Sequence, residues 1–408
     1  MKNAKNQTLY LFTGSYPFGG VETFIENEIK HLASSFKEII IVPSEDSDYV
    51  REVPRNVIVD VSFCILFKDK NRKIRSFFTL TFILGLLKHI KYSFSLTAIR
   101  RINSFISDSE IVFKWLKNNN IKENSIIYTY WFNGKTFGAI KFKNKYSRNL
   151  RIVSRTHRYD LYDYWFKPPF WPYRQEALNL IDKLYVISQD GIDFLKSKYK
   201  AGDNVCLSRL GITDRKTLGL TSKDDILRIV SVANLNRVKR IPLLLKYLRK
   251  IAIEKPNLNI EWTHFGDGPE MDILLKELDQ MDGNNFKIFL KGRVPNSEIY
   301  EYYKNQRVDL FINISESEGV PVSIMEAQSY GKFVIATDVG GTKELILENY
   351  GFLIPVNCTF DQFRKALESF IEKKEEYISL ANEIRERCID YYDASKNYTE
   401  FTKSLLES

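Results

Sequence analysis

Two glutamates, Glu318 and Glu326, stand eight positions apart in SESEGVPVSIMEAQSYG, which follows the apolar run VDLFINI. The run predicts a buried strand, and the segment after it predicts a helix that starts at Pro321 and ends at Gly331. Ligands of open α/β sheets bind at the carboxyl ends of strands. A helix start suits an anion, and carboxylates beside it suit hydroxyl groups. The loop therefore favours a diphosphate flanked by a sugar and a ribose.

The backbone amides expected to face this anion are those of Val320, Val322 and Ser323. A purely structural interpretation is also open, because acidic residues favour helix N-termini in general. On that interpretation Glu318 only caps the helix and Glu326 faces solvent.

Length and composition bound the class of protein. The chain has 408 residues, enough for two cores, with 44% hydrophobic and 27% charged residues, as in soluble globular proteins. Its four cysteines lie far apart without a CxxC pair, which fits a reducing cytosol and argues against a disulfide scaffold or a zinc site. The N-terminal residues lack a long apolar stretch, so we expect no signal peptide.

The net charge of +9 is concentrated in residues 65–101, which hold nine Lys/Arg and one acid, Asp69. Within this segment lies FFTLTFILGLL (77–87), which is shorter than the roughly 20 residues that span a bilayer. Two interpretations stay open. The run lies on an anionic membrane surface, or it is a buried helix with solvated basic ends.

Short apolar runs alternate with helical patterns along almost the whole chain, which predicts parallel sheets covered on both faces. Two such series predict an α/β fold of two doubly wound domains, covering residues 1–213 and 214–384. The polar stretch 211–225 is the expected seam. The last helix, about 385–408, either completes the second domain or packs back onto the first.

The motif E-G-V-P-V-S-I-M-E-A resembles the E-x7-E motif of glycosyltransferase family 4, which has the GT-B fold. Four further pieces resemble elements of that family in order and spacing: FGGVETFIENEIKHL (18–32), HFGDGPE (264–270), FLKGRVPNSEIYEYY (289–303) and FVIATDVGGTKELI (333–346). The resemblance covers most of the chain.

The resemblance implies two Rossmann-like domains facing each other across a cleft, with the acceptor on the first and the nucleotide sugar on the second. It implies a retaining, metal-independent hexosyltransferase that uses a UDP- or GDP-sugar and a glycan or lipid-linked acceptor, without a cofactor. A place in surface polysaccharide biosynthesis follows, in the cytoplasm or peripherally on the inner face of the cell membrane.

The resemblance also implies roles for single residues. Glu318 would hold donor-sugar hydroxyls and Glu326 the ribose, and the base would rest near Gly292 and Arg293. The donor contacts around the helix start would come from Gly319, Val320, Pro321, Val322 and Ser323.

Cations that meet the charge of the leaving diphosphate would contribute directly to the rate. The family places an Arg, and five residues later a Lys, after the first strand of the second domain. In SVANLNRVKR the Lys corresponds to Lys239, but Asn234 stands at the Arg position. Either Asn234 donates a neutral hydrogen bond, or Arg237 or Arg240 supplies the charge. A solvated basic turn is the structural alternative.

His157 ends the strand pattern RIVSRTH, and by the resemblance it would contact a sugar hydroxyl or orient the acceptor. Gly19 and Gly20 would lie opposite the diphosphate, and Glu22 is expected to be an acid at a helix N-terminus. Acceptor contacts are expected from Trp131, Asn133 and Tyr159.

No carboxylate of the first half has motif support as a nucleophile, so front-face substitution is the expected route. A non-catalytic GT-B subunit of a polysaccharide-assembly complex is the alternative that Asn234 favours. Nucleic-acid binding fits less well, because the positive charge flanks an apolar run. The donor sugar, the base, the acceptor and the linkage stay open.

Overall fold

The computed structural model describes residues 7–20, 22–146, 149–278, 285–347 and 349–407. The chain divides into two compact units: unit 1 is Met1–Gly211 with Ala394–Ser408, and unit 2 is Ile212–Asp393. The segment that returns to unit 1 therefore begins at Ala394, later than the position near 385 expected from the sequence. The reason is that α17 (Ala381–Tyr392) packs against α13 (Val322–Ser329) inside unit 2.

Unit 1 is built on a seven-stranded sheet whose described strand pairs are parallel, in the order β3-β2-β1-β4-β5-β6-β7. Its strands are short and apolar, as buried parallel strands require. They are β1 (Thr8–Thr13), β2 (Glu38–Pro43), β3 (Val57–Val59), β4 (Ile126–Thr129), β5 (Arg151–Thr156), β6 (Lys183–Val186) and β7 (Val205–Leu207).

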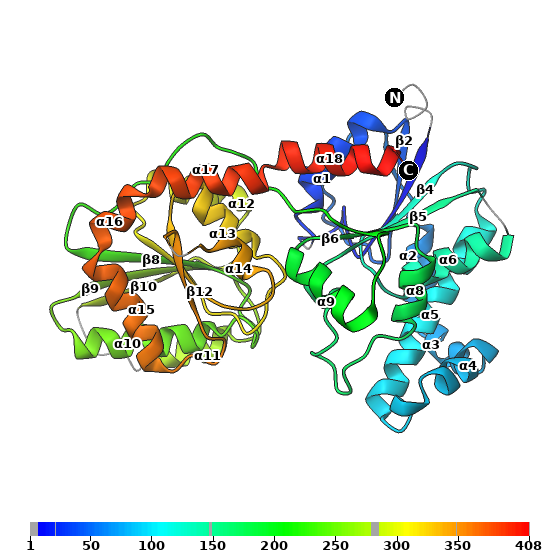
Figure 1. Ribbon diagram of the computed structural model, residues 1–408, viewed down its shortest axis with the longest axis horizontal. Helices are drawn as coiled ribbons and strands as arrows, with labels where there is room; N and C mark the ends of the chain where they lie inside the picture. The colour runs from blue at the N-terminus through cyan, green and yellow to red at the C-terminus, as the bar shows by residue number, and fades with distance from the viewer. Residues whose placement is uncertain (1–6, 21, 147–148, 279–284, 348, 408) are drawn as a thin grey trace. The chain divides into compact units, whose positions relative to one another are not determined.

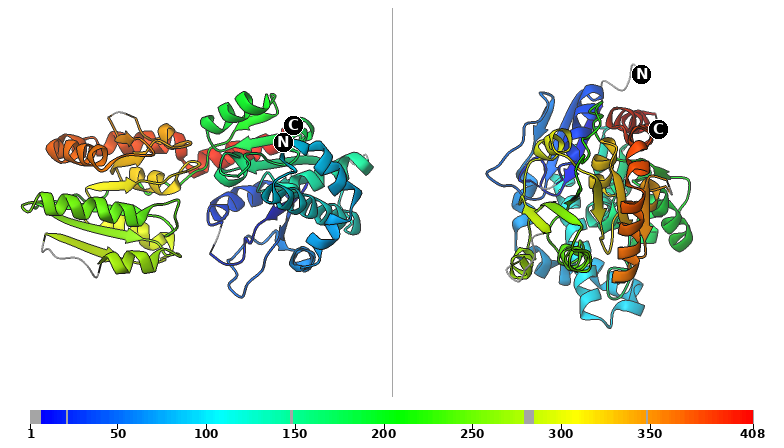
Figure 2. Two further views of the ribbon diagram at one scale, coloured as in Figure 1. Left: turned by 90° about the horizontal axis from the view of Figure 1, so that it is seen from below. Right: turned by 90° about the vertical axis from the view of Figure 1, so that its left-hand side faces the viewer.

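Helices cover both faces of this sheet (Figures 1 and 2). One face carries α1 and α18, which contact each other, and the other carries α5 and α6. The helices of unit 1 are α1 (Ile25–Ser35), α2 (Ser62–Lys68), α3 (Arg72–Phe77), α4 (Leu80–Lys88), the 3-10 helix η2 (Ile90–Tyr92), α5 (Leu96–Asn118), α6 (Gly134–Tyr146), α7 (Arg158–Leu161), α8 (Arg174–Leu180), α9 (Gln189–Tyr199) and α18 (Ala394–Leu406).

Unit 2 holds a six-stranded sheet in the order β10-β9-β8-β11-β12-β13, with α10 and α11 on one face and α12 and α13 on the other (Figure 1). Its strands are β8 (Ile226–Val232), β9 (Asn259–Phe265), β10 (Phe286–Leu290), β11 (Leu310–Asn313), β12 (Phe333–Thr337) and β13 (Gly351–Ile354). Its helices are α10 (Ile241–Glu254), α11 (Met271–Leu278), α12 (Asn296–Asn305), α13, α14 (Thr342–Leu345), α15 (Phe360–Glu372), α16 (Lys374–Ser379) and α17.

Each sheet reverses its strand order beside its first strand, between β1 and β4 in unit 1 and between β8 and β11 in unit 2. This is the doubly wound Rossmann arrangement, in which ligands bind at the carboxyl ends of the strands beside the reversal. The predicted fold class of two Rossmann-like α/β domains is thus confirmed.

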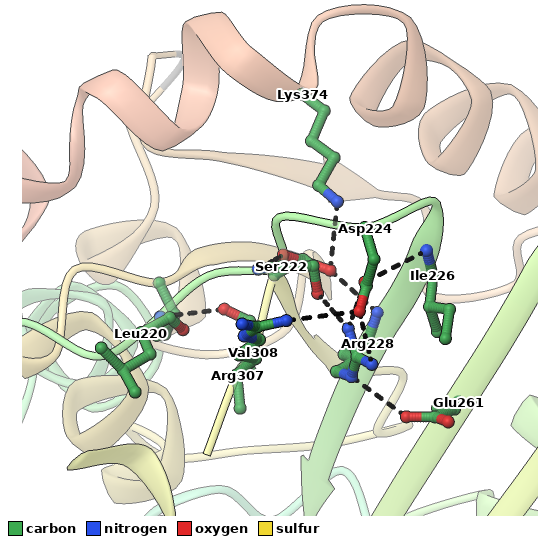
Figure 3. A network of polar contacts seen from close by, with 11 residues as sticks. Leu220, Ser222, Asp224, Ile226, Arg228, Glu261, Arg307, Val308 and Lys374 are labelled. Atoms are coloured by element: carbon green, nitrogen blue, oxygen red, sulfur yellow. Dashed lines mark hydrogen bonds and ion pairs between the residues drawn. The ribbon is translucent and has the colours of Figure 1, made fainter. Parts of the chain in front are cut away.

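The amino ends of β8 and β11 carry a network of charges that satisfy one another (Figure 3). The Arg228 guanidinium donates to Asp224 at 2.6 Å and to Glu261 at 3.0 Å. Asp224 also accepts from Arg307 at 3.3 Å, and Lys374 lies 3.3 Å from Asp309. These charges hold the unit together at the edge of the sheet opposite to the one where a ligand is expected.

A buried ion pair holds unit 1 together. Arg155 on β5 and Glu28 on α1 are both fully buried and lie 3.3 Å apart, and Tyr128 on β4 donates to Glu28 at 2.8 Å. The Arg155 guanidinium also lies 4.3 Å from the ring centroid of Phe401 on α18. Burial raises the pKa of Glu28, and the charge of Arg155 opposes that rise. Three elements and the returning helix therefore depend on one guanidinium.

We expect Arg155→Met to lower the free energy of unfolding by about 3–5 kcal/mol, because Glu28 then stays buried without a cation. Urea unfolding at neutral pH measures this. Adding Glu28→Gln should recover part of the loss, and the exposed Arg55→Met should change stability by less than about 0.5 kcal/mol. An Arg155→Met protein as stable as the wild type would contradict the assignment.

Candidate functional site

The loop that follows β11 in unit 2 brings a carboxylate and a cation together. Lys239, on the loop after β8, donates to the Oε1 atom of Glu318 at 2.6 Å, and Asn313 donates to the same atom at 3.2 Å. The two loops meet because β8 and β11 are parallel neighbours, so their carboxyl ends share one edge. The sequence predicted Glu318 and Lys239 separately, and the structure joins them.

Glu318 is buried, with 6% of its surface exposed. Burial by itself raises the pKa of a carboxyl group, but the charge of Lys239 and hydrogen bonds from Lys239, Ser315 and Asn313 bring the pKa of Glu318 below its usual value. Glu318 is therefore an ionised carboxylate held in place by a lysine.

A glycine turn from the neighbouring strand presses on the Glu318 backbone. Gly340 follows β12 with a φ of +52°, and a Cβ atom there would lie 2.2 Å from the Glu318 carbonyl oxygen. The Gly341 amide donates to the Gly319 carbonyl at 2.6 Å. Only a glycine permits this close approach with a positive φ, which explains the Gly-Gly turn of FVIATDVGGTKELI.

Helix α13 begins one residue later than the sequence suggested. Pro321 has an extended backbone, with ψ of 111°, and precedes the first helical residue, Val322. The amides of Val322 and Ser323 belong to the first turn, where helix geometry leaves N–H groups without an intrahelical partner. Gly331, with φ of +73°, follows the end of the helix as predicted.

The second glutamate, Glu326, lies inside α13 and is 4% exposed. The Tyr300 hydroxyl donates to its Oε1 atom at 2.9 Å, and the Asn296 amide lies 3.3 Å from the same atom. Burial raises the pKa of Glu326 to about 7, and the hydrogen bond from Tyr300 opposes that rise. The interpretation of Glu326 as a solvent-facing residue is therefore wrong.

Sequence reasoning missed Tyr300 and Asn296. They stand four positions apart in NSEIYEYYKN, a spacing that places two residues on one face of a helix. Arg215 lies 4.6 Å from the ring centroid of Tyr300 and adds a positive charge behind it.

Three further residues of the loop after β8 were predicted as donor contacts, and they differ in their surroundings. Arg240 donates to the carbonyls of Ile314 and Val356, both at 2.6 Å, and to that of Ser315 at 3.3 Å. Asn234 and Arg237 are exposed. Because Arg240 binds backbone carbonyls, Arg237 is the better candidate for the charge that Asn234 lacks.

The G-D-G-P element supports this loop by close backbone packing. A Cβ atom at Gly266 would lie 1.8 Å from the Ala233 carbonyl oxygen, and one at Gly268 would lie 2.4 Å from that of Leu235. The Gly266 amide donates to the Gly292 carbonyl at 2.8 Å, which places Gly292 beside the loop. Space within 4 Å of a Cβ at Gly292 is open, and the adjacent Arg293 is exposed.

In unit 1, His157 directly follows β5 and lies among aromatic rings. Its ring centroid is 4.8 Å from that of Tyr130, 4.7 Å from that of Trp131 and 5.5 Å from that of Phe24. Burial, and next the charge of Arg155, hold the pKa of His157 well below its usual value. Neither ring nitrogen has a partner among the described residues. The imidazole is neutral and can exchange hydrogen bonds with a hydroxyl group.

The expectation for Glu22 is wrong. Helix α1 starts at Ile25, and Glu22 has a φ of 57° outside it. Its carboxylate accepts from the amides of Gly14 at 2.9 Å and of Ser15 and Tyr16 at 2.8 Å, and from the Trp131 indole at 2.5 Å. Glu22 therefore fills the amide-lined loop after β1 and orients the indole that contacts His157.

The remaining predicted residues of unit 1 are Asn133, Tyr159, Gly19 and Gly20. Asn133 accepts from the Lys135 amide at 3.0 Å at the start of α6. Tyr159 is 60% exposed and packs against the edges of other aromatic rings of unit 1. Gly19, with φ of +64°, and the exposed Gly20 belong to the loop between β1 and α1.

Residues 213–389 match the family model described as "Glycosyl transferases group 1". This match spans most of unit 2, which is therefore similar to glycosyltransferase group 1 domains.

Two curated relatives share part of the chain. An uncharacterized glycosyltransferase of Haemophilus influenzae is 25% identical over 222 residues, which cover 53% of this chain and 59% of that protein. The O-antigen biosynthesis glycosyltransferase WbnH of Escherichia coli is 27% identical over 179 residues, covering 44% and 46%. The chain thus matches about half the length of these relatives.

Two solved structures resemble almost the whole chain. Sucrose-phosphate synthase from Thermosynechococcus elongatus gives a TM-score of 0.71 at 14% identity over 98% of both chains. HepE of Anabaena, in complex with UDP and glucose, gives 0.62 at 16% identity over 98% of this chain and 99% of that one. At such identities the likeness shows the fold, which is GT-B.

We expect Lys239→Met to destabilise the protein more at pH 7 than at pH 4. In the wild type the depressed pKa of Glu318 gives stability that is present above the unfolded value, near 4.5, and is lost as the pH falls. Without Lys239, burial raises that pKa, so the stability difference should grow toward pH 7, to about 1–3 kcal/mol.

Urea unfolding at several pH values measures this difference, and the exposed Lys365→Met in α15 is the control. A difference that does not vary with pH would show that Lys239 does not set the ionisation of Glu318.

Proposed function

We propose that this chain is a retaining glycosyltransferase that moves a hexose from a nucleotide-diphosphate sugar to a glycan or lipid-linked glycan acceptor, without a metal ion or another cofactor. Surface polysaccharide biosynthesis is the proposed setting, at the inner face of the cell membrane. The match of unit 2 to the group 1 family model supports the class, and the O-antigen relative supports the setting. A UDP-type donor is supported by the HepE complex.

The observation that carries the proposal is the Lys239–Glu318 pair at the start of α13. It combines a fixed cation, an ionised carboxylate and the free amides of a helix start at one sheet edge. In the proposed reaction Lys239 and these amides meet the charge that grows on the leaving diphosphate. Glu318 then accepts hydrogen bonds from the hydroxyls of the donor sugar.

Glu326 is proposed to bind the ribose. A carboxylate accepts two hydroxyl donors at once, and Tyr300 and Asn296 already fix its orientation. Because Glu326 has a pKa of about 7, accepting two hydroxyls would require it to release its proton when the nucleotide binds.

The proposed chemical step is a front-face substitution. The bond from the anomeric carbon to the diphosphate oxygen breaks, and the electron pair stays on the diphosphate. The acceptor oxygen forms the new bond on the same face, and its proton passes to the departing phosphate oxygen. Neutral His157 is proposed to hydrogen-bond a sugar hydroxyl, and Trp131 and Tyr159 to line the acceptor's path.

A non-catalytic GT-B subunit is the second candidate, because of the loop after β8. Asn234 is neutral, and Arg240 already binds three carbonyls. If Arg237 does not supply the missing charge, the site keeps its binding groups and loses part of its transition-state stabilisation.

A screen of UDP-, GDP- and ADP-sugars by thermal shift and by release of free nucleotide tests the proposal. We expect one donor class to raise the unfolding midpoint and to yield nucleotide. Lys239→Ala should lower turnover by roughly 100-fold or more, whereas Lys365→Ala should not. A raised midpoint without turnover would favour the non-catalytic subunit, and no response to any donor would refute both.

The ionisation of Glu326 should be visible in nucleotide binding. Below a pH of about 7, wild-type affinity for UDP should rise with pH by up to about tenfold per pH unit relative to Glu326→Gln, because only the ionised carboxylate accepts both hydroxyls. The titration of the UDP phosphate affects both proteins equally, so it cancels in the ratio of the wild-type affinity to the Glu326→Gln affinity. Calorimetry measures it, with the exposed Glu301→Gln of α12 as control. A constant ratio would remove Glu326 from the ribose site.

A further inference from the structure

The helices between β3 and α5 expose an unusual number of apolar side chains. We call residues 65–96 the basic helical insertion. Of the 27 exposed large hydrophobic residues in the described chain, 11 lie in this segment. They are Ile65, Ile74, Phe77, Phe78, Leu80, Ile83, Leu84, Leu87, Ile90, Phe94 and Leu96. The interpretation of the apolar run 77–87 as a buried helix therefore holds for one face only, since within the run only Phe82 and Gly85 are buried.

Helix α4 shows how this exposure arises. Its inner face carries Phe82 and Gly85, which are buried against α5. A Cβ atom at Gly85 would lie 2.9 Å from the Ile106 side chain, so α4 and α5 are in close contact. The outer face is also apolar, and four of its side chains are between 51% and 69% exposed: Leu80, Ile83, Leu84 and Leu87.

Two aromatic residues lie on either side of α4 in the chain and are almost fully exposed. Phe78 is 84% exposed and Phe94 is 91% exposed. Helices α2, α3 and α4 all contact α5, so the segment that carries these two residues packs along one helix of unit 1 (Figure 1). Patches of this kind, rimmed by polar groups, mark interaction surfaces.

The rim of this layer is strongly positive. Its one acid between residues 65 and 101, Asp69, forms an ion pair with Arg75. Lys68 and Lys88 pair with Asp46 and Glu176 from outside the segment. Within the described part of the chain, four exposed cations of this rim form no ion pair, namely Lys70, Lys73, Lys91 and Arg100.

We propose that the basic helical insertion binds the surface of an anionic lipid membrane. The outer face of α4, with Phe78 and Phe94, enters the boundary between headgroups and acyl chains, and the unpaired cations contact anionic headgroups. With nine residues, α4 lies in the plane of the surface, since crossing takes about 20. No helix of the described residues is both long and apolar enough to span a bilayer.

Charge favours a lipid surface over the other occupants. A second copy of this chain docked on the same patch would bring two sets of unpaired cations together, and their repulsion opposes pairing. A nucleic acid would leave the apolar centre of the patch without a partner, because its phosphates contact cations. An anionic bilayer offers an apolar layer beneath a negatively charged one.

Vesicle flotation of the full chain tests this inference, which does not depend on the proposed chemistry. We expect binding to vesicles of phosphatidylcholine with phosphatidylglycerol, weak binding to phosphatidylcholine alone, and loss of most binding at about 1 M salt. Lys70→Glu with Lys73→Glu should lower the partition coefficient by roughly 30-fold or more. Phe78→Ser with Leu84→Ser should lower it comparably.

Matched controls are the exposed Ile253→Ser and Lys365→Glu of unit 2, which should bind vesicles as the wild type does. All substituted side chains are exposed, so the variants should keep the wild-type circular dichroism and unfolding midpoint. Absence of wild-type binding to anionic vesicles would overturn the inference. So would a concentration-dependent dimer that the Phe78/Leu84 variant dissociates, because the patch would then bind a second copy.

Discussion

A carboxylate removed from water must be paired with a cation, bonded to several donors, or protonated, because an unpaired buried charge costs several kcal/mol. Among the residues that the structure describes, four glutamates are buried, and they meet the constraint in three ways. Glu28 is paired with an arginine and Glu318 with a lysine. Glu22 accepts from three backbone amides and an indole. Glu326 has only neutral donors, so its proton stays until near neutral pH.

The contrast between Glu318 and Glu326 follows from the elements around them. Glu318 lies in a loop at the shared edge of β8 and β11, where the lysine of the next loop reaches it. Glu326 lies inside a helix, where its neighbours are the tyrosine and asparagine of α12. Two identical side chains eight residues apart therefore differ in charge below neutral pH.

The alternation of apolar runs with helical patterns was enough to predict two doubly wound units, and the apolar run before Glu318 was enough to predict that its loop follows a strand. Three features were beyond the pattern. The positive φ of Glu22 turns its carboxylate back over β1, which no local rule indicates. From the sequence, Arg240 could equally be a solvated cation, and only the structure shows that it donates to three backbone carbonyls. The apolar sequence of α4 is the same whether the outer face of the helix is buried or exposed, so the sequence does not distinguish the two.

Arg240 also connects the loops around the candidate site. One guanidinium binds carbonyls from the loop after β11 and from the segment after β13, and Gly341 bonds the turn after β12 to the first of these. Three connections that would otherwise fluctuate independently form a single body. The entropy of ordering them is lost once, when the chain folds. For a ligand that binds at this edge, the loops would already be ordered. The free energy of binding would then be reduced less by the entropy of ordering them.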